Sequence, residues 1–424
     1  MIKQAKNIII IGGGFAGLNA ALKLQKHNFN ITLFDRRNFH LFQPLLYQVA
    51  SGGLSPADIA FPLRAIFKYK KNISIIQSEI TNIDLLKNKV TAKSTDYSYD
   101  YLIIAAGAKS HYFGKNEWAN YTIGLKSIED ATSIRNLILS SFEKAEIEID
   151  PDKKKALLTF AIIGGGPAGV ELAGAIAELA NHTLQYDFRN IDPSTAKILL
   201  IEGSNRILPP YPENLSNKAT KDLEKLGVKI MVNNFVSKIE KSIIFLTSGD
   251  KLSEIKANSI IWAAGVRAEL LSDILSQNFS INLDKAGRII VNEYCQIPQF
   301  KNVFAIGDIS NFKDEKGLNL PGVAPVAMQQ GKYVAKFIYN HFINKENKKF
   351  KYFDKGNLAV IGRKAAVAFR GNLKFSGTFA WLVWLFVHLL YLVGFENRFL
   401  VASQWAFNYF TLNRSARLIA NNSK

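Results

Sequence analysis

The stretch "NIIIIGGGFAGLNAALKLQKHNFNITLFDRR", Asn7–Arg37, decides the fold of this 424-residue chain. A continuous apolar run, Ile8–Ile11, predicts a buried parallel strand, and a helical pattern of apolar residues follows it. Between the two lie three glycines spaced G-x-G-x-x-G, and a second apolar strand, Ile31–Phe34, leads to Asp35. Strand, glycines, helix, strand and acid in that order predict a dinucleotide-binding βαβ unit.

Each part of this unit has a physical role. Gly12 permits a tight turn, Gly14 lets the backbone approach a pyrophosphate, and Gly17 lets helix and strand pack closely. The helix N-terminus supplies N–H donors and the positive end of a dipole. Asp35, 18 residues after the last glycine, is expected to accept a hydrogen bond from a ribose hydroxyl.

The same arrangement recurs 152 residues later, in "LTFAIIGGGPAGVELAGAIAELA". Its glycines are Gly164, Gly166 and Gly169, and the following strand, Lys197–Ile201, ends at Glu202. This acid is expected to bond a ribose 2′-hydroxyl and to repel a 2′-phosphate, which favours NADH over NADPH. Two units imply two dinucleotides, and hydride transfer between a nicotinamide and a flavin is the chemistry that most often needs both.

Three further apolar strands support a duplicated α/β fold. "YDYLIIAAGA" (Tyr99–Ala108) and "ANSIIWAAGV" (Ala257–Val266) both end in Ala-Ala-Gly and are expected at equivalent positions of two related domains. Taken alone, each Ala-Ala-Gly also fits a plain turn from strand to loop. "NVFAIGDIS" (Asn302–Ser310) predicts another buried strand, closed by Gly307-Asp308.

Composition excludes several classes of protein. Hydrophobic residues make up 48% of the chain and charged residues 21%, which excludes a disordered protein. The single cysteine, Cys295, excludes a disulfide framework, a CxxC redox pair and a thiolate metal site, and we expect it to be a small packed hydrophobe. The six histidines show no ligand spacing, so no protein-ligated metal is expected. Nothing at the N-terminus resembles a secretion signal, which favours a protein that stays in the cytoplasm.

The charge of the chain is concentrated near its C-terminus. Residues 336–424 hold 14 Lys and Arg against 3 Asp and Glu, so 14 − 3 = +11 of the net +18 lies there. The same region contains Thr378–Phe395, 18 residues without a charge. Basic charge beside apolar surface suits an anionic membrane better than a nucleic acid, although a lysine-rich surface composition accounts for part of it.

Two apolar helices are expected at this end, in Thr378–Phe395 and in the amphipathic stretch Phe399–Ile419. The tryptophans and tyrosines of both stretches suit a membrane–water interface. We favour helices lying in the headgroup layer over a helix that spans the membrane. A dimer interface made of the same apolar surface is compatible with either arrangement.

The motifs together resemble the type II NADH:quinone oxidoreductases of the two-dinucleotide flavoprotein reductase superfamily. The likeness rests on "HLFQPLLYQVASGGLSP" (His40–Pro56), "GGGPAGVELAG", "LPGVAPVAMQQG" and the tail "WLVWLFVHLLYLVGF", and it covers nearly the whole chain. It implies hydride transfer from NADH to FAD and then transfer of two electrons to a membrane quinone, without proton pumping. Proteins of this family are peripheral and often dimeric. The expected location is the cytoplasmic side of the cell inner membrane.

The resemblance also implies a domain organisation and a set of cofactor contacts. Residues 1–113 and the return segment 285–340 are expected to form the FAD domain, residues 114–284 the NADH domain, and residues 341–424 a membrane-associating region. Asp308 is expected to bond the ribityl chain of FAD. The other FAD contacts implied are Gly12, Gly14, Phe15, Ala16, Gly17, Asp35, Arg36, Gln43, Ala106, Gly107, Gly307 and Ala327, and those of NADH are Gly164, Gly166, Gly169, Glu202, Ala264 and Gly265. For Arg36 an exposed surface arginine is the alternative.

Two catalytic residues are implied, Glu171 and Gln329. Glu171 follows the second fingerprint by two residues, where the family places a glutamate near the contact between flavin and nicotinamide. We expect it to position the nicotinamide and to supply a proton; the alternative is an exposed carboxylate stabilised by the helix dipole.

Gln329 lies in a predicted helix, Ala324–Phe342, that begins with Pro325 in its first turn. The family pattern there is Ala-Gln-x-Ala-x-Gln, associated with quinone contact. In this chain proline replaces the first glutamine and Gln329 keeps the second, so quinone contact is expected at Gln329. Gln330 lies about 100° further round the helix and is expected to face solvent or the partner domain.

The sequence also allows other functions. A soluble NAD(P)H-dependent reductase of a protein electron carrier, such as a ferredoxin, is the main alternative, and an NADH-sensing flavoprotein that is not an enzyme is a third. Disulfide reductases and sulfide:quinone oxidoreductases need more cysteines than this chain has. The apolar stretch Thr378–Phe395 favours the membrane quinone reductase, because a soluble reductase has no use for it.

Overall fold

The computed structural model describes residues 4–420, which form two compact units. Within the described residues, the first unit comprises residues 4–41, 60–109 and 266–355, and the second comprises residues 42–59, 110–265 and 356–420. The chain therefore crosses between the units several times. The predicted domain boundaries stay predictions, but contacts group residues 42–59 and 356–424 with the second unit, an association that the sequence did not indicate.

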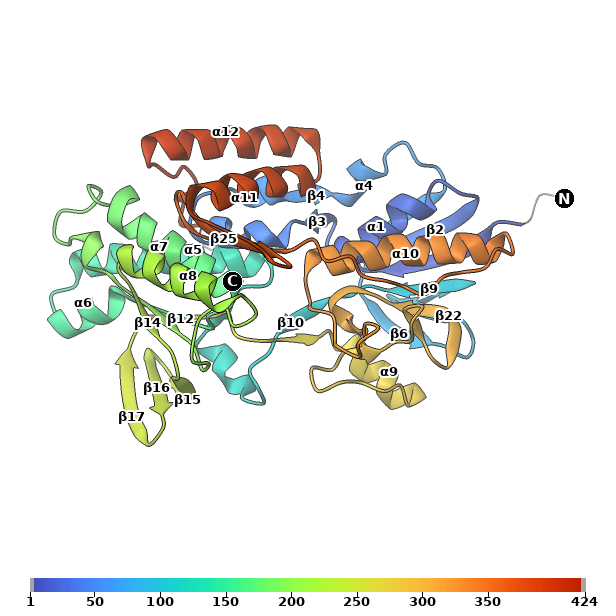
Figure 1. The fold of residues 1–424 in the computed structure, drawn as a ribbon, viewed down its shortest axis with the longest axis horizontal. Coiled ribbons are helices and arrows are strands. Elements are labelled where there is room, and N and C mark those ends of the chain that lie inside the picture. Colours follow the sequence, from blue (N-terminus) through green and yellow to red (C-terminus); the bar gives the residue numbers. More distant parts are fainter. Residues whose placement is uncertain (1–3, 421–424) are drawn as a thin grey trace. The chain divides into compact units, whose positions relative to one another are not determined.

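The first unit is built on a six-stranded sheet in the order β21-β22-β9-β1-β2-β5 (Figure 1). All neighbours pair in parallel except β21, and the central strand β1 places Ile10 beside Leu33 of β2 and Ile103 of β9. The continuous apolar runs that predicted these strands are buried on both faces. The strands are β1 Lys6–Ile11, β2 Phe29–Asp35, β5 Ile73–Gln77, β9 Tyr101–Ile104, β21 Gln296–Ile297 and β22 Phe300–Ala305.

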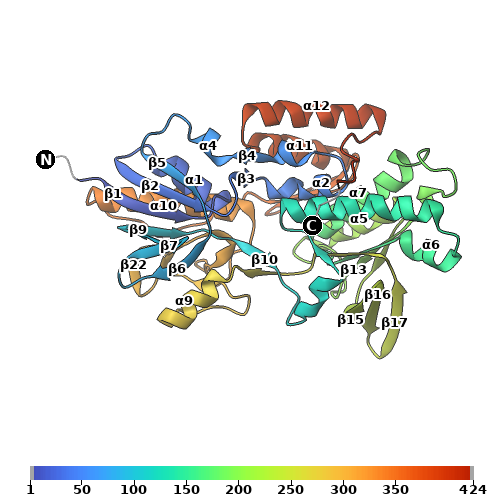
Figure 2. The same cartoon turned by 180° about the vertical axis from the view of Figure 1, so that it is seen from behind.

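Helices α1 (Phe15–Leu24) and α10 (Ala324–Phe342) lie side by side on this sheet (Figures 1 and 2). A Cβ at Gly331 would lie 2.2 Å from the carbonyl oxygen of Ala16, so only glycine permits this approach of α10 to α1. The predicted bounds of α10, and Pro325 in its first turn, are confirmed. Smaller elements of the unit are β3 Phe39–Leu41, β4 Ala60–Pro62, α4 Leu63–Ile66, β6 Ile80–Asp84, β7 Lys89–Ala92, β8 Thr95–Ser98, β19 Val266–Ala268, α9 Leu271–Phe279, β20 Ile289–Ile290 and β23 Ser310–Asn311.

The second unit repeats the parallel sheet, in the order β11-β18-β12-β13-β14. Its central strand β12 pairs with β13 and β18 as β1 pairs with β2 and β9, so the two Ala-Ala-Gly strands occupy equivalent positions, as predicted. The strands are β11 Ile123–Gly124, β12 Thr159–Ile163, β13 Lys197–Ile201, β14 Val228–Met231 and β18 Ser259–Trp262, and the antiparallel strands β15 Phe235–Glu240, β16 Ile243–Ser248 and β17 Lys251–Lys256 form a separate sheet. The helices are α2 Leu46–Ala50, α3 Pro56–Ile59, α5 Ile128–Ile147, α6 Pro151–Leu157, α7 Pro167–Glu178 and α8 Glu213–Lys225.

The C-terminal region of this unit consists of a three-stranded antiparallel sheet and two helices, seen at the red end of the colour scale in Figure 1. A Cβ at Gly174 of α7 would lie 1.8 Å from the carbonyl oxygen of Ile361, so the sheet packs directly on α7. Among residues 4–420, no helix combines the length and the apolar character needed to cross a membrane. The elements are β24 Asn357–Gly362, β25 Ala365–Arg370, β26 Leu373–Ser376, α11 Gly377–Tyr391 and α12 Phe395–Thr411.

We expect Gly331→Ala to lower the free energy of unfolding by about 2 kcal/mol, because the added methyl group overlaps backbone that cannot move freely. Thermal unfolding, followed by circular dichroism, measures the change. Lys336→Ala, at an exposed position of the same helix, is the control and should unfold like the wild type. An unaltered midpoint for Gly331→Ala would show that α1 and α10 can separate at no cost.

Candidate active site

Both glycine fingerprints form the same turn at the end of a central strand. Gly12 has φ +103° and Gly164 has φ +112°, a region that side chains other than glycine rarely adopt. A Cβ at Gly12 would lie 2.3 Å from the carbonyl oxygen of Ala105, and one at Gly164 would lie 2.7 Å from the amide nitrogen of Ala264. The turn therefore needs glycine at both positions, for backbone conformation and for space.

The two acids that end β2 and β13 are bound to these turns in the same way. Asp35 accepts a hydrogen bond at Oδ2 from the Gly13 amide at 2.6 Å, and Glu202 accepts one at Oε2 from the Gly165 amide at 2.7 Å. Their second oxygens accept from the amides two residues further on, Arg37 and Ser204. Burial raises the pKa of Asp35, while the amides of Gly13 and Arg37 oppose the shift. Each acid is thus oriented at the edge of the sheet where the glycine turn lies.

The helix N-termini behind both turns are open on the side where a pyrophosphate would lie. Gly14 and Gly166 are the N-caps of α1 and α7, and a Cβ at either would meet no atom within 4 Å. Neither cap carries a side-chain hydrogen bond, so backbone N–H groups of the first turn remain for an anion. Open cap, tight turn and oriented acid fit a dinucleotide in each unit.

The Ala-Ala-Gly ends of β9 and β18 also match. Gly107 and Gly265 both have φ +80°, and the alanines before them, Ala106 and Ala264, are half-buried at the end of their strands. The carbonyl of Gly107 accepts from the amide of Glu269, and that of Gly265 accepts from the amide of His111. The same backbone conformation at equivalent sheet positions supports a shared role beside a cofactor.

The Gly307-Asp308 turn follows β22 and meets the start of α10. A Cβ at Gly307 would lie 3.2 Å from the Cβ of Ala16 and 3.5 Å from that of Ala327, so three predicted FAD contacts come together here. The amide of Gly307 donates to Oε1 of Gln330 at 2.7 Å. Gln330 is only 1% exposed.

The expectation that Gln330 faces solvent or the partner domain is therefore wrong. Its position on the helix places it beneath the Gly307-Asp308 turn, where a buried amide satisfies a buried backbone N–H. Gln329 is half-buried, and its amide forms two hydrogen bonds with the backbone of Phe353, at 2.9 and 3.0 Å. Its predicted contact with a quinone stays a prediction.

The remaining predicted FAD contacts are less closely grouped. Phe15 meets His40 edge to face, with ring centroids 5.1 Å apart, and Nδ1 of His40 lies 2.9 Å from the carbonyl oxygen of Gly13. Arg36 is exposed and forms an ion pair with Glu269 at 3.0 Å, which agrees with its alternative assignment as a surface arginine. Gln43 is also exposed.

Glu171 is half-buried in the first turns of α7, and burial raises the pKa of its carboxyl to about 8. The Val360 amide, which donates to Oε1 at 3.4 Å, opposes this shift. Burial raises the pKa of two phenols, Tyr47 and Tyr211, and a charge on Glu171 would raise both further. The alternative of an exposed carboxylate is wrong, and the raised pKa favours the protonated form of Glu171.

Sequence reasoning missed two residues near Glu171. Tyr47 belongs to the motif "HLFQPLLYQVASGGLSP", which was used only to identify the family. Arg414 entered the sequence analysis only through the count of basic residues in 336–424, yet its side chain is 12% exposed and pairs with Glu178 of α7. No local pattern distinguishes a buried arginine from a surface one. Cys295 is completely buried, as predicted, and residues 4–420 contain no cluster of acids, cysteines or histidines that could hold a metal ion.

Comparisons with known proteins agree with this geometry. The family of pyridine nucleotide-disulphide oxidoreductases matches residues 6–331, and the NDH2 C-terminal domain matches residues 355–412. The type II NADH:quinone oxidoreductase Ndh of Mycobacterium tuberculosis is 40% identical over 98% of this chain and 90% of its own length. A type II NADH:quinone oxidoreductase of Haemophilus influenzae is 30% identical over 85% of this chain and 86% of its own length.

Solved structures show the same fold. NDH2 from Plasmodium falciparum, solved in complex with NADH, superimposes with a TM-score of 0.89 over 98% of this chain and 100% of its own, at 23% identity. A sulfide:quinone oxidoreductase from Aquifex aeolicus gives a TM-score of 0.74 at 21% identity, covering 93% of this chain and 92% of its own.

Fold and glycine turns thus define a flavoprotein oxidoreductase with two dinucleotide sites. Within this class, the chain belongs to the type II NADH:quinone oxidoreductase family. Its cofactors are FAD and NADH.

We expect Glu202→Gln to lower the preference for NADH over NADPH about tenfold, measured as the ratio of kcat/KM, because the substitution removes the charge that repels a 2′-phosphate. The amide oxygen of the glutamine can still accept from Gly165, so the turn is preserved. Asp250→Asn, at an exposed position of the same unit, is the control. An unchanged ratio would mean that Glu202 does not face the ribose.

The raised pKa of Glu171 predicts a pH-dependent stability. The folded-state pKa, about 8, exceeds the ordinary glutamate pKa of 4.5, so this group's favourable contribution is complete below about pH 4.5 and is lost as the pH rises through 8. We expect Glu171→Gln to unfold like the wild type at pH 5 and to be more stable at pH 9 by roughly 2 kcal/mol, a value reduced for partial exposure. Thermal melts at the two pH values test this; equal melting at pH 9 would contradict the burial of the charge.

Proposed function

We infer that this chain is a non-proton-pumping NADH dehydrogenase that reduces a quinone. FAD held in this chain would supply acceptance of a hydride from NADH and delivery of its two electrons to the quinone; the proton carried with the hydride and one proton from solvent would complete the quinol. The observation that carries this inference is the pair of identical glycine turns, each with an oriented acid, in a chain whose only cysteine is buried. With no redox cysteine pair, the electron acceptor must come from outside the chain.

We propose that the first unit binds FAD and the second binds NADH. In the first unit, the Gly307-Asp308 turn and α10 lie beside the fingerprint helix, which supports a site longer than a single nucleotide. In the second unit, Glu202 is held where a ribose 2′-hydroxyl would be recognised, which supports NADH. The domain boundaries and cofactor contacts predicted from the sequence belong to this proposal.

Glu171 and Gln329 are the proposed catalytic residues. Burial raises the pKa of Glu171 to about 8, so this carboxyl can hold a proton for the reaction and regain it from solvent. Gln329 orders the segment around Phe353 through both amide atoms, and quinone contact at this residue is proposed from the resemblance alone.

We propose that the C-terminal helices lie on the cytoplasmic face of the inner membrane. One face of α11 presents Phe379, Leu382, Phe386 and Leu390 to the outside, and one face of α12 presents Phe399, Phe407 and Phe410. Lys364, Lys374 and Arg370 lie just before them in the chain, so basic and apolar groups adjoin. The same surface would serve a homodimer, which stays a proposal.

A soluble ferredoxin reductase was the main alternative. The curated relatives support the quinone function and not this alternative. We expect the purified holoenzyme to oxidise NADH with a short-chain quinone and to prefer NADH over NADPH. Reduction of ferredoxin but not of quinone, or a preference for NADPH, would contradict the proposed function.

The double variant Phe399→Glu/Phe410→Glu tests the membrane surface. Both side chains are exposed, so two charges there should weaken binding to anionic liposomes about tenfold or more and leave turnover with a soluble quinone unchanged. Flotation on a sucrose gradient measures the binding. Leu86→Glu, at an exposed position of the first unit, is the matched control. Wild-type flotation of the double variant would rule out this surface as the membrane contact.

A further inference from the structure

The chain does not end with α12 but returns along the second unit. This C-terminal strap, residues 412–420, lies almost entirely beyond the matched C-terminal domain, which ends at residue 412. The strap is tied along its length: the carbonyl of Leu412 accepts from Thr183 Oγ1, the amide of Ala416 donates to the carbonyl of Gly52, Arg417 pairs with Asp187, and Ala420 bonds Asn136. It is therefore a fixed part of the unit.

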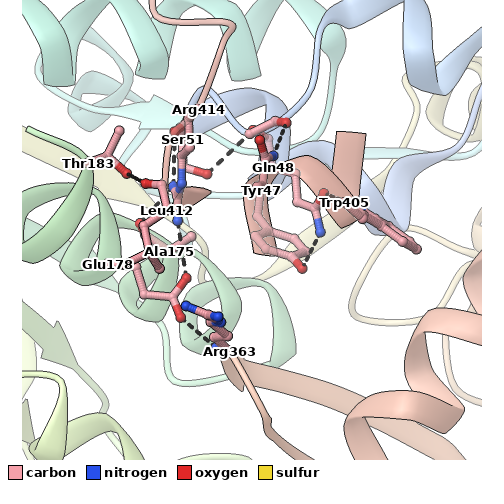
Figure 3. Close-up of polar contacts among 12 residues, drawn as sticks. Tyr47, Gln48, Ser51, Ala175, Glu178, Thr183, Arg363, Trp405, Leu412 and Arg414 are labelled. Atoms are coloured by element: carbon pink, nitrogen blue, oxygen red, sulfur yellow. Dashed lines mark hydrogen bonds and ion pairs between the residues drawn. The ribbon is translucent and has the colours of Figure 1, made fainter. Parts of the chain in front are cut away.

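Arg414 is the central contact of the strap (Figure 3). Its guanidinium donates to the carbonyl of Ser51 at 3.0 Å, to the carbonyl of Ala175 at 2.9 Å and to Oε2 of Glu178 at 3.2 Å. The other oxygen of Glu178 accepts from the Arg363 amide at 2.5 Å. A charge buried among such fixed acceptors is held in one geometry, and its removal leaves Glu178 without its cation.

These acceptors belong to the helix turns next to Glu171 and Tyr47. Ser51 ends α2 one turn after Tyr47, and Ala175 and Glu178 follow Glu171 by one and two turns on the same face of α7. Arg414 thus joins the helix that carries the carboxyl to the helix that carries the phenol.

A second contact fixes the phenol itself. Nε1 of Trp405, in α12, donates to Oε1 of Gln48 at 2.7 Å, and Nε2 of Gln48 donates to the hydroxyl oxygen of Tyr47 at 2.9 Å (Figure 3). The hydroxyl therefore accepts from one side and keeps its own proton for another acceptor. Tyr47 is buried, and the charge of Arg414 acts on its pKa against the charges of Glu171 and Glu178.

We propose that Arg414 is a positioning residue for Glu171: by clamping α2 to α7 it fixes the position of the Glu171 carboxyl and limits the access of water to it. This rests on the proposed function, in which Glu171 holds the proton needed by the quinone. Proton supply then depends on a residue outside both nucleotide-binding folds. The charged or titratable groups around Glu171 are Glu178 on its own helix, Tyr47 on α2, Tyr211, and Arg414 on the strap.

Arg414→Gln tests the proposal, with the two half-reactions of the holoenzyme measured separately. Stopped-flow reduction of the flavin by NADH under anaerobic conditions should be unchanged. Quinone reduction should fall about tenfold or more, as for other residues that orient a reacting group. Water admitted beside Glu171 lowers its pKa, so quinone reduction should decline at a lower pH than in the wild type.

Two further variants complete the design. Arg417→Gln removes the other ion pair of the strap, with Asp187 at the surface, and should behave like the wild type. Arg414→Lys keeps the charge beside Glu178 but cannot span three acceptors, so it should fold and show a smaller defect in the same half-reaction. If Arg414→Gln does not fold, the quinone half-reaction of Arg414→Lys tests the proposal in its place.

Three outcomes would overturn the proposal. Wild-type quinone reduction in Arg414→Lys and Arg414→Gln would show that the clamp is not needed. An equal fall in both half-reactions, with an unmoved pH profile, would show a purely structural role. A wild-type enzyme that reduces no quinone would contradict the proposed function as well, which distinguishes this failure from the first two.

Discussion

The hydrogen bond between an acid at a strand end and the second glycine of a turn is the constraint on which both nucleotide-binding units depend. It fixes the turn that ends the central strand, and the turn fixes where the next helix begins. In each unit the carboxylate also accepts from the amide two residues further along, so one side chain orders backbone on two segments. Strand order and helix placement then follow from the ordinary packing of βαβ units.

Much of this architecture could be predicted from the sequence because its determinants are local. Runs such as Ile8–Ile11 are too apolar for an exposed strand, and glycines with positive φ, such as Gly12, accept no other residue without strain. Because the same motifs occur twice at similar spacing, the prediction of a nucleotide-binding fold for one unit supported the same prediction for the other. The helix Ala324–Phe342 was predicted with its observed bounds because its determinants, the apolar periodicity and Pro325 in the first turn, are also local.

The rest depends on contacts between distant segments. The prediction for Gln330 failed because helical periodicity gives only the angle between two side chains of one helix. It does not say which of the two faces the core. The packing of α10 shows that Gln330 points to Gly307. Arg414 and Tyr47 were missed because nothing in their local sequence marks them as buried. Their burial follows from the meeting of residues 46–58 with a strap more than 350 residues away.

The connection of residues 42–59 with the C-terminus also sets an order of assembly. Gln48, Ser51, Gly53 and Asp58 are hydrogen-bonded to Trp405, Arg414, Asn408 and Asn397, all near the end of the chain. During synthesis the early segment leaves the ribosome long before its partners exist, whereas its neighbours in sequence can already join the first sheet. The second unit is therefore completed only after residues 397–414 have been synthesised, and a chain interrupted before residue 397 would leave these groups of residues 48–58 without their partners.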